Sequence, residues 1–329
     1  MRFFPIYILM CASALTACGS ATKNTAENTA EEKNKVTVDF NADSAYSYVA
    51  AQTAFGPRVP NSHAHMQCAD WLAVKLAELG VEDVHTDQVQ LKAFDGTTLN
   101  ARNISGSINP KADKRILLLS HWDSRPWADQ ETDPTLRDKP IDGANDGASG
   151  VGVILEIARA LRNAPAKAGV DILFVDAEDY GRPSDDTNGD PNEESWALGT
   201  QYWVQNPTLD LSKIRYAVLL DMVGGKDATF SREYFSERSA HDINDKVWKA
   251  ASMAGHSDKF VSGIGAPVMD DHIYLLKAGI PAIDIIECAN PQTGCFNPTW
   301  HTHADNIDNI DRTTLQAVGE TVLTAIYNE

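Results

Sequence analysis

Five residues that could share a metal ion are spread along the chain, each in a turn or at the end of an apolar run. They are His121, Asp146, Asp179, Asp221 and His301. The set offers carboxylate oxygen and imidazole nitrogen without thiolate, which suits a catalytic zinc that keeps one coordination position open. One such residue in a loop is usually solvated, but two carboxylates and a histidine at successive strand ends indicate a metal site.

Asp146 lies in a glycine-rich turn, Gly-Ala-Asn-Asp-Gly-Ala-Ser-Gly, over residues 143–150. Glycines let the backbone pack closely around a carboxylate, and an amphipathic helix pattern follows at residues 151–161. An Asp just before a helix is often only its N-cap. The turn alone leaves both roles open, and the other four residues favour a metal ligand.

Glu178 stands directly before Asp179, just after a buried apolar run. Adjacent residues past a strand end can have different roles, one binding metal and the other moving a proton. A glutamate near a metal and other carboxylates can have a pKa suited to general acid–base catalysis. Two solvated acids are the alternative, and the buried strand that leads into the pair argues against it.

Buried apolar runs predict the strands that position these residues, at 115–120, 170–175, 217–220 and 282–286. Predicted helices separate or follow them, at 195–205, 240–254, 271–278 and 313–326. Upstream, the pattern predicts helices at 41–53 and 62–79 and a strand at 81–91. We therefore expect a three-layer α/β/α sandwich around a mixed, mostly parallel sheet, with ligands at the carboxyl ends of its strands.

The composition is that of an acidic globular protein. The 329 residues are 43% hydrophobic and 22% charged, with a formal net charge of −18. A nucleic-acid partner needs a basic face for its phosphates. The charge therefore argues against nucleic acid and leaves the substrate open.

The first 38 residues indicate targeting rather than fold. Residues 1–17 resemble a bacterial lipoprotein signal peptide, with Leu-Thr-Ala before Cys18, which would become the lipidated first residue. An ordinary secretory signal cut elsewhere is the alternative. Residues 18–38 are polar and typical of a flexible tether. We expect one catalytic domain at 39–329, held in the bacterial cell envelope by its lipid anchor alone and facing the periplasm.

Three of the five cysteines lie in this expected domain. Export permits disulfides, and Cys288 and Cys295 flank a short loop, so they are the plausible pair. Cys68 aligns with leucines at helical spacing and is expected in the core. An oxygen-rich stretch at 185–194 could bind Ca²⁺, but it lacks EF-hand spacing and we favour a solvated acidic loop.

Five short motifs follow one another along the chain. They are the Asp146 turn, Asp176-Ala177-Glu178-Asp179, Leu220-Asp221-Met222-Val223-Gly224, Asp270-Asp271-His272 and Trp300-His301-Thr302. Their order and strand context resemble the zinc aminopeptidase-like superfamily, and within it the type II (animal-type) glutaminyl cyclases. The resemblance covers most of the chain from about residue 40. Each motif is weak by itself, and the five in order are specific.

The resemblance implies one of two metal sites. A two-zinc aminopeptidase would use all five candidate ligands, whereas a cyclase would bind one zinc through Asp146, Asp179 and His301. Asp270 two residues before His272 favours the cyclase, as does Trp300 directly before the ligand histidine. Animal cyclases have Glu-Glu where this chain has Glu-Asp at 178–179. The shorter Asp179 would require the backbone to approach the metal more closely.

For a cyclase, the resemblance implies a role for each remaining site residue. Glu178 would be the proton shuttle, taking a proton from the α-amine and delivering it to the leaving ammonia. Asp221 and Asp270 would form a carboxylate network around it that keeps one shared proton. Trp300 would wall the substrate pocket, and Trp196 would be either a second wall or a packing residue.

The function implied by the resemblance is glutaminyl-peptide cyclotransfer, which converts N-terminal glutamine of peptides or proteins to pyroglutamate and releases ammonia. The substrate carries its own nucleophile, so one zinc that polarises the γ-carbonyl suffices. A two-zinc aminopeptidase and a non-catalytic binding lipoprotein are the alternatives. The proton shuttle Glu178 argues against a binder, which has no need of one.

Overall fold

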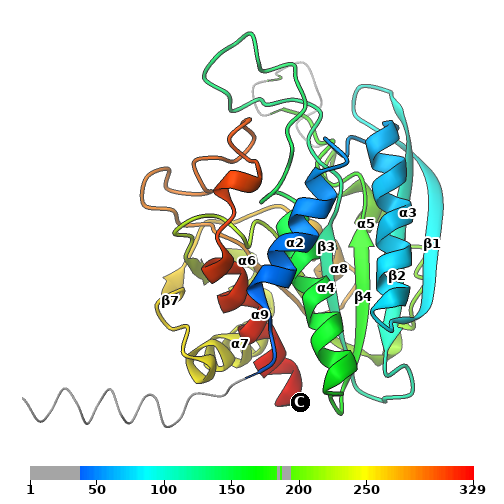
Figure 1. Cartoon of the computed structure of the whole chain (residues 1–329), viewed down its shortest axis with the longest axis vertical. Helices are drawn as coiled ribbons and strands as arrows, with labels where there is room; N and C mark the ends of the chain where they lie inside the picture. Colours follow the sequence, from blue (N-terminus) through cyan, green and yellow to red (C-terminus); the bar gives the residue numbers. More distant parts are fainter. Residues whose placement is uncertain (1–37, 184–185, 187–193) are drawn as a thin grey trace, which may run out of the picture. The chain divides into compact units, whose positions relative to one another are not determined.

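A twisted six-stranded sheet carries the fold, with strand order β1-β2-β4-β3-β5-β8 (Figure 1). The structure is a computed structural model and describes residues 38–183, 186 and 194–329. The strands are β1 Glu82–Lys92, β2 Thr98–Ile108, β3 Arg115–His121, β4 Gly169–Val175, β5 Ile214–Leu220 and β8 Ala282–Ile285. β2 pairs antiparallel with β1 and β4, while β3, β4, β5 and β8 run parallel. The expected mixed, mostly parallel sheet is confirmed.

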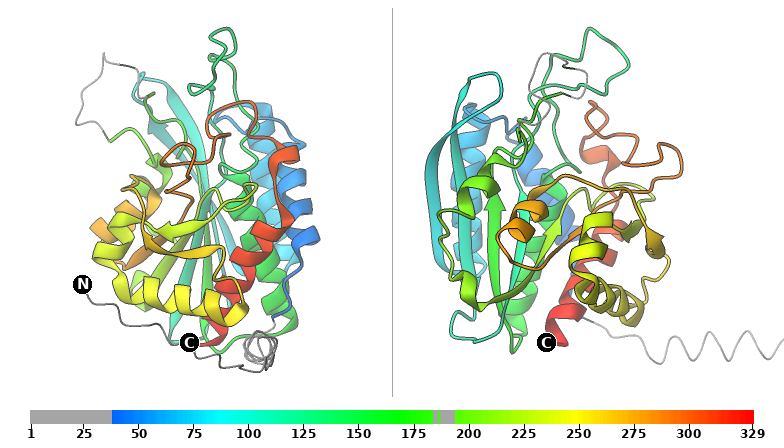
Figure 2. Two further views of the ribbon diagram at one scale, coloured as in Figure 1. Left: turned by 90° about the vertical axis from the view of Figure 1, so that its left-hand side faces the viewer. Right: turned by 180° about the vertical axis from the view of Figure 1, so that it is seen from behind.

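Helices cover both faces of this sheet (Figure 2). The longer ones are α2 Ala42–Thr53, α3 His63–Glu78, α4 Ala148–Asn163, α7 His241–Ala254 and α9 Arg312–Tyr327. The shorter ones are α5 Leu198–Trp203, α6 Tyr234–Ser239 and α8 Asp271–Lys277. Figures 1 and 2 place α2, α3, α4 and α9 on one face and α5 and α8 on the other. The expected three-layer sandwich is confirmed.

Alternate residues of the central strands enter two separate cores. Ile116 and Leu118 of β3 pack with the α2, α3, α4 and α9 layer, while Leu117 and Leu119 pack with Trp203 of α5 and its neighbours. All seven residues of β3 and of β4 are buried. A strand that is covered on both faces is mostly apolar, and the buried charges Arg115 of β3 and Asp171 of β4 pair with each other. The apolar runs are why these strands were evident in the sequence.

The beginning of α4 approaches the sheet closely. A Cβ on Gly150 would lie 2.0 Å from the carbonyl oxygen of Leu220 and 2.4 Å from Ser120 Oγ, so only glycine fits. Gly147 precedes the helix with φ +91° and makes no side-chain cap. Asp146 is therefore not the N-cap of α4. The capping alternative is wrong, and its carboxylate is free for another role.

The pair of short strands β6 Phe230–Arg232 and β7 Phe260–Ile264 was not expected from the sequence. They form a separate parallel two-stranded sheet. Phe260 packs edge-on against Trp248 of α7 with ring centroids 5.3 Å apart. These strands are ordered by tertiary packing, so their few residues show no clear alternation in the sequence.

The disulfide that the sequence made possible is not formed: Cys288 and Cys295 are both free. Backbone hydrogen bonds close the loop between them, from Asn290 N to Cys295 O (2.9 Å) and from Gly294 N to Asn290 O (2.8 Å). Cys288 is fully buried and Cys68 lies in the main core, as expected for Cys68. Loop closure by the backbone removes the need for a covalent bridge.

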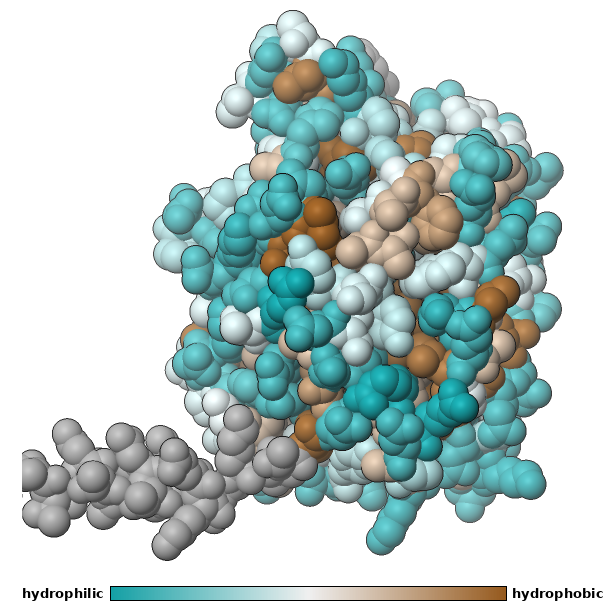
Figure 3. Space-filling view, viewed as in Figure 1, coloured by the Kyte–Doolittle hydropathy of each residue, from teal (hydrophilic) through white to brown (hydrophobic). Residues whose placement is uncertain are grey.

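The expected signal segment, Cys18 and the tether up to residue 37 lie outside the described residues. Most of the acidic stretch 185–194 does so too, and of its described residues Asp186 pairs with Arg182 and Glu194 with Lys277. The described residues, from 38 onward, group into one compact unit by their contacts. Among the described helices, none has the length and apolar character needed to cross a membrane. The face with α2, α4 and α9 is largely hydrophilic (Figure 3).

Candidate active site

The predicted site residues converge at the carboxyl ends of three adjacent parallel strands. His121 ends β3, Glu178 and Asp179 follow β4, and Asp221 follows β5. Asp146 reaches the same place from the turn before α4. His301 joins them from the loop before α9, and Asp270 from the N-terminus of α8. All are at least nine-tenths buried.

Asp146, Asp179 and His301 form a group that could hold a metal ion. His301 Nε2 lies 3.6 Å from Asp146 Oδ2 and 3.4 Å from Asp179 Oδ1. Ligand atoms around a tetrahedral zinc are roughly 3.3–3.6 Å apart, given zinc–ligand bonds of about 2.0–2.2 Å. Asp179 Oδ2 is buried without a hydrogen-bond partner. This donor set and spacing fit zinc.

A second group, His121, Asp146 and Asp221, shares Asp146 with the first. His121 Nε2 lies 3.0 Å from Asp146 Oδ1 and 3.2 Å from Asp221 Oδ1, which are hydrogen-bond distances. Burial lowers the pKa of His121, but its bonds to Asp123, Asp146 and Asp221 outweigh that and hold the pKa well above 6.5. The tighter spacing favours a charged imidazole over a second ion, although the residue types suit either.

Arg125 supports the first metal group from behind. Its Nε and Nη2 donate to the two carboxylate oxygens of Asp129 at 2.7 and 2.9 Å, and its Nη1 donates to the carbonyl of Asp179 at 2.9 Å. Asp129 Oδ1 in turn lies 3.0 Å from His301 Nδ1. Burial opposes it, but the bonds from His301 and Arg125 lower the pKa of Asp129 below its usual value. A carboxylate on the far nitrogen orients a ligand histidine.

Buried carboxylates also fix the backbone at the site. Asp305 accepts hydrogen bonds from the backbone N–H of Asn145 (2.7 Å) and Asp146 (3.1 Å). Asp123 accepts from the N–H of Glu178 (3.2 Å) and Asp179 (3.1 Å). Each anchor therefore places one side of the metal group.

Three non-glycine residues at the site have left-handed backbone conformations. Ala177, Met222 and His301 have φ of 54°, 49° and 53°. Such a conformation costs about 1–2 kcal/mol per residue, so the surrounding packing must hold it. Ala177 comes directly before Glu178, and Met222 comes directly after Asp221. Each left-handed residue therefore sets the direction of the acid next to it.

The carboxylates opposite the metal group carry raised pKa values. Burial is the main cause for Glu178, and repulsion from Asp270 and Asp179 adds to it, so its pKa lies well above 4.5. Burial and repulsion from Asp221 raise the pKa of Asp270 to about 7. Burial likewise raises the pKa of Asp221 despite its bond to His121. Asp270 can therefore hold a proton near neutral pH and share it with the neighbouring acids.

A cavity of about 300 Å³ lies between the metal group and these acids. Trp196 and Trp300 line it together with Glu178, Asp270 and the metal group. Both indoles stack on the His301 ring, with centroids 6.0 Å and 3.9 Å away. Trp196 therefore lines the cavity, and it also packs under the Arg125 guanidinium, 4.6 Å from its ring centroid.

The residues that the sequence prediction singled out lie together in the structure, but the prediction missed their supports. Arg125, Asp129, Asp123 and Asp305 were not singled out as site residues. Two signals were available, because Asp123 stands two residues after His121, just past the end of a buried strand, and Asp305 lies in the same polar loop as His301. Nothing in the local sequence pairs Arg125 with Asp129 and His301.

Comparison with known proteins identifies related chains. Residues 103–326 match the model of "Peptidase family M28". A solved structure described as Bacteroides thetaiotaomicron glutaminyl cyclase bound to N-acetylhistamine is 51% identical, with a TM-score of 0.86. The similarity covers 90% of this chain and 100% of that one.

Curated relatives with either activity are more distant. Aminopeptidase YwaD of Bacillus subtilis is 28% identical over 244 residues, covering 73% of this chain and 46% of that protein. Glutaminyl-peptide cyclotransferase of Bos taurus is 27% identical over 237 residues, covering 65% of this chain and 62% of that protein. The chain thus spans about half to three-fifths of these relatives.

The Arg125 network makes a prediction for metal affinity. Arg125→Lys keeps the charge but cannot make the forked bond to Asp129 or the bond to the Asp179 carbonyl. We expect zinc affinity to fall about 10–100-fold, measured by competition with a chelator of known affinity. Arg115→Lys is the matched control, because Arg115 makes a similar buried pair with Asp171 (2.7 Å) at the opposite end of β3. Equal affinity of the Arg125 variant and this control would contradict the assignment.

The raised pKa of Asp270 predicts how stability depends on pH. In metal-free protein, the unfolded state loses this proton near pH 4 and the folded state near pH 7. The folded state therefore binds more protons between these values, and stability falls as pH rises through this window. Asp270→Asn removes that loss, so we expect it to gain at least about 1 kcal/mol relative to wild type between pH 4.5 and 7.5.

Thermal unfolding with a chelator present, at both pH values, measures this difference. Asp113→Asn is the control, because Asp113 is exposed on the loop before β3. If the stability of the wild type changed with pH in the same way as that of Asp270→Asn, Asp270 would have its normal pKa in the folded protein.

Proposed function

The chain belongs to peptidase family M28, and we propose that within this family it is a zinc-dependent glutaminyl-peptide cyclotransferase. The proposed reaction converts the N-terminal glutamine of a peptide or protein to pyroglutamate and releases ammonia. One observation carries the proposal: 51% identity to a solved glutaminyl cyclase over the whole length of that chain. The cavity that Glu178 lines together with the metal group supports it.

Asp146, Asp179 and His301 would hold the zinc, and the bound ion would polarise the γ-carbonyl of the substrate glutamine and stabilise its developing negative charge. Glu178 takes a proton from the substrate α-amine as that nitrogen bonds to the γ-carbon. It then gives the proton to the γ-amide nitrogen as the bond from carbon to this nitrogen breaks. Atoms balance, because one C–N bond forms, one breaks and ammonia leaves.

The residues around Glu178 suit this proton transfer. Burial and repulsion from Asp270 and Asp179 raise the pKa of Glu178 well above 4.5, which suits a group that accepts a proton and returns it. Asp221 and Asp270 line the same cavity as Glu178, so a proton can be shared among the three acids. Trp196 and Trp300 exclude water and restrict the glutamine to one orientation, and a fixed intramolecular geometry can supply an effective molarity of 10⁵ M or more as an order of magnitude.

A two-zinc aminopeptidase is the second candidate, and a specific observation supports it. His121, Asp146 and Asp221 form a second metal-competent group that shares a carboxylate with the first. In that case, a peptide would lose its whole first residue by hydrolysis. The two functions therefore differ in product and in the number of ions bound.

Mass spectrometry of a glutamine-initiated peptide after incubation tests the proposal. We expect the loss of one ammonia from an otherwise intact peptide, and Glu178→Gln should retain zinc but lose about 10²–10⁴ of the turnover. Glu82→Gln, at an exposed position at the start of β1, should behave as wild type. Removal of the first residue would instead support the aminopeptidase, and undiminished turnover would remove Glu178 from its role.

We also propose that the protein is a lipoprotein of the bacterial cell envelope that meets exported or imported peptides. The support is the signal-like sequence 1–17, with small residues directly before Cys18, and the polar segment that follows. Cys18→Ser should abolish incorporation of a labelled fatty acid into the protein and release it from the membrane fraction. Labelling of the Cys18→Ser variant at the wild-type level would exclude this anchor.

A further inference from the structure

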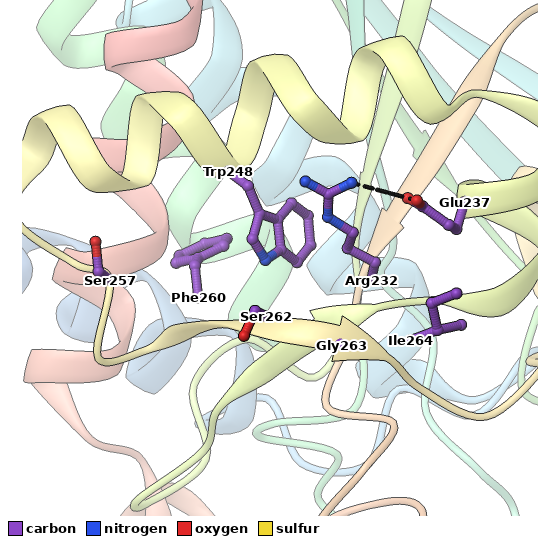
Figure 4. Close-up of a pocket in the computed structure, with 8 residues that line it drawn as sticks. All are labelled: Arg232, Glu237, Trp248, Ser257, Phe260, Ser262, Gly263 and Ile264. Carbon is purple, nitrogen blue, oxygen red and sulfur yellow. Dashed lines mark hydrogen bonds and ion pairs between the residues drawn. The ribbon is translucent and has the colours of Figure 1, made fainter.

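One segment, residues 262–270, joins the catalytic cavity to a second hollow. Its final residues, Pro267 to Asp270, line the catalytic cavity. Ser262 to Ile264 line a hollow of about 470 Å³ beside Arg232 and Trp248 (Figure 4). The two hollows therefore lie at the two ends of a single short stretch of chain.

The backbone of this segment is anchored to neighbouring elements. Gly265 N donates to Arg232 O at 2.8 Å, and Ala266 N donates to Cys288 O at 3.0 Å. Val268 N donates to Oε1 of Glu233, whose side chain is fully buried, at 3.0 Å. A segment held in this way presents its side chains in fixed positions.

Its large apolar side chains nevertheless face solvent. Ile264 is 61% exposed and Met269 is 55% exposed, and Pro267 between them is also exposed. Tyr234 is 37% exposed and lies beside the segment, because its N–H donates to Ala266 O at 3.5 Å. In the described part of the chain six large hydrophobic side chains are well exposed, and three of them are Tyr234, Ile264 and Met269.

Single exposed apolar residues need no explanation, but several on and beside one short segment that reaches a cavity indicate a binding surface. The charged groups near it are already paired. Arg232 binds Glu237 at 3.2 Å and Asp245 at 2.7 Å, and Figure 4 shows Ile264 next to this Arg232–Glu237 pair. The surface therefore offers apolar contact rather than free charge.

We propose that Tyr234, Ile264, Pro267 and Met269 form an apolar ledge that binds the residues after the N-terminal glutamine of a peptide substrate. This inference rests on the proposed function. The reacting glutamine enters the catalytic cavity, and the peptide that follows it must leave across the rim, where Met269 borders the cavity. The ledge spans at most about 17 Å along the chain, the length of four to five extended substrate residues. It fits apolar side chains at those positions.

Three substrates that all begin with glutamine test the ledge: glutamine amide, Gln-Leu-Leu-amide and Gln-Asn-Asn-amide. We expect kcat/KM for the leucine peptide to exceed that for the asparagine peptide by about tenfold. Ile264→Asn and Met269→Gln should each reduce this ratio severalfold. Val74→Asn, at a position 57% exposed on α3, is the matched control and should keep the ratio.

The outcomes separate this inference from the proposed function. No ammonia from glutamine amide would contradict the cyclotransferase itself. Ammonia from all three probes with a wild-type ratio near one would overturn the ledge while leaving the cyclotransferase intact, and this comparison needs no variant. A wild-type preference that persists in both ledge variants would also overturn it, because other residues would then provide the preference.

Discussion

Asp146, Asp179 and Asp221 lie at the ends of neighbouring secondary-structure elements with almost no contact with water. An ionised carboxylate in such a place is costly unless a cation or several hydrogen bonds compensate it. With Glu178 and Asp270 in the same cavity, five acids share about 300 Å³. The rest of the site can be understood as the means by which this buried negative charge is balanced.

The charge is balanced differently on the two sides of the cavity. Near His301, Arg125 bonds to Asp129 and to the Asp179 carbonyl, and a zinc ion fits between the ligands. Without that ion, burial and repulsion from Asp146 raise the pKa of Asp179 to about 6. Near Glu178 and Asp270, the pKa values are raised and protons balance the charge. The same burial therefore produces metal ligands on one side and a proton carrier on the other. Cyclisation requires both.

Close backbone packing keeps this arrangement rigid. Gly150 allows α4 to lie against the Leu220 carbonyl, and Gly147 turns beside His121, where a Cβ would lie 2.9 Å from its Cε1. Left-handed conformations at Ala177 and Met222 set the directions of the adjacent acids. Such positions are unfavourable by themselves and are held by the sheet beneath them, so the reacting groups have little freedom to move apart.

The sequence by itself determined the layers of the fold and the chemical types at the site. Runs such as residues 115–120 and 170–175 must be strands covered on both faces, and parallel strands bring His121, Glu178 and Asp221 to one edge. Local patterns carry this information because burial acts on each strand separately. Only the tertiary structure decided that Arg125 connects Asp129 with the site, that Cys288 and Cys295 stay apart, and that β6 and β7 form at all. These features depend on contacts between distant segments, and such contacts leave no periodic signal in any one of them.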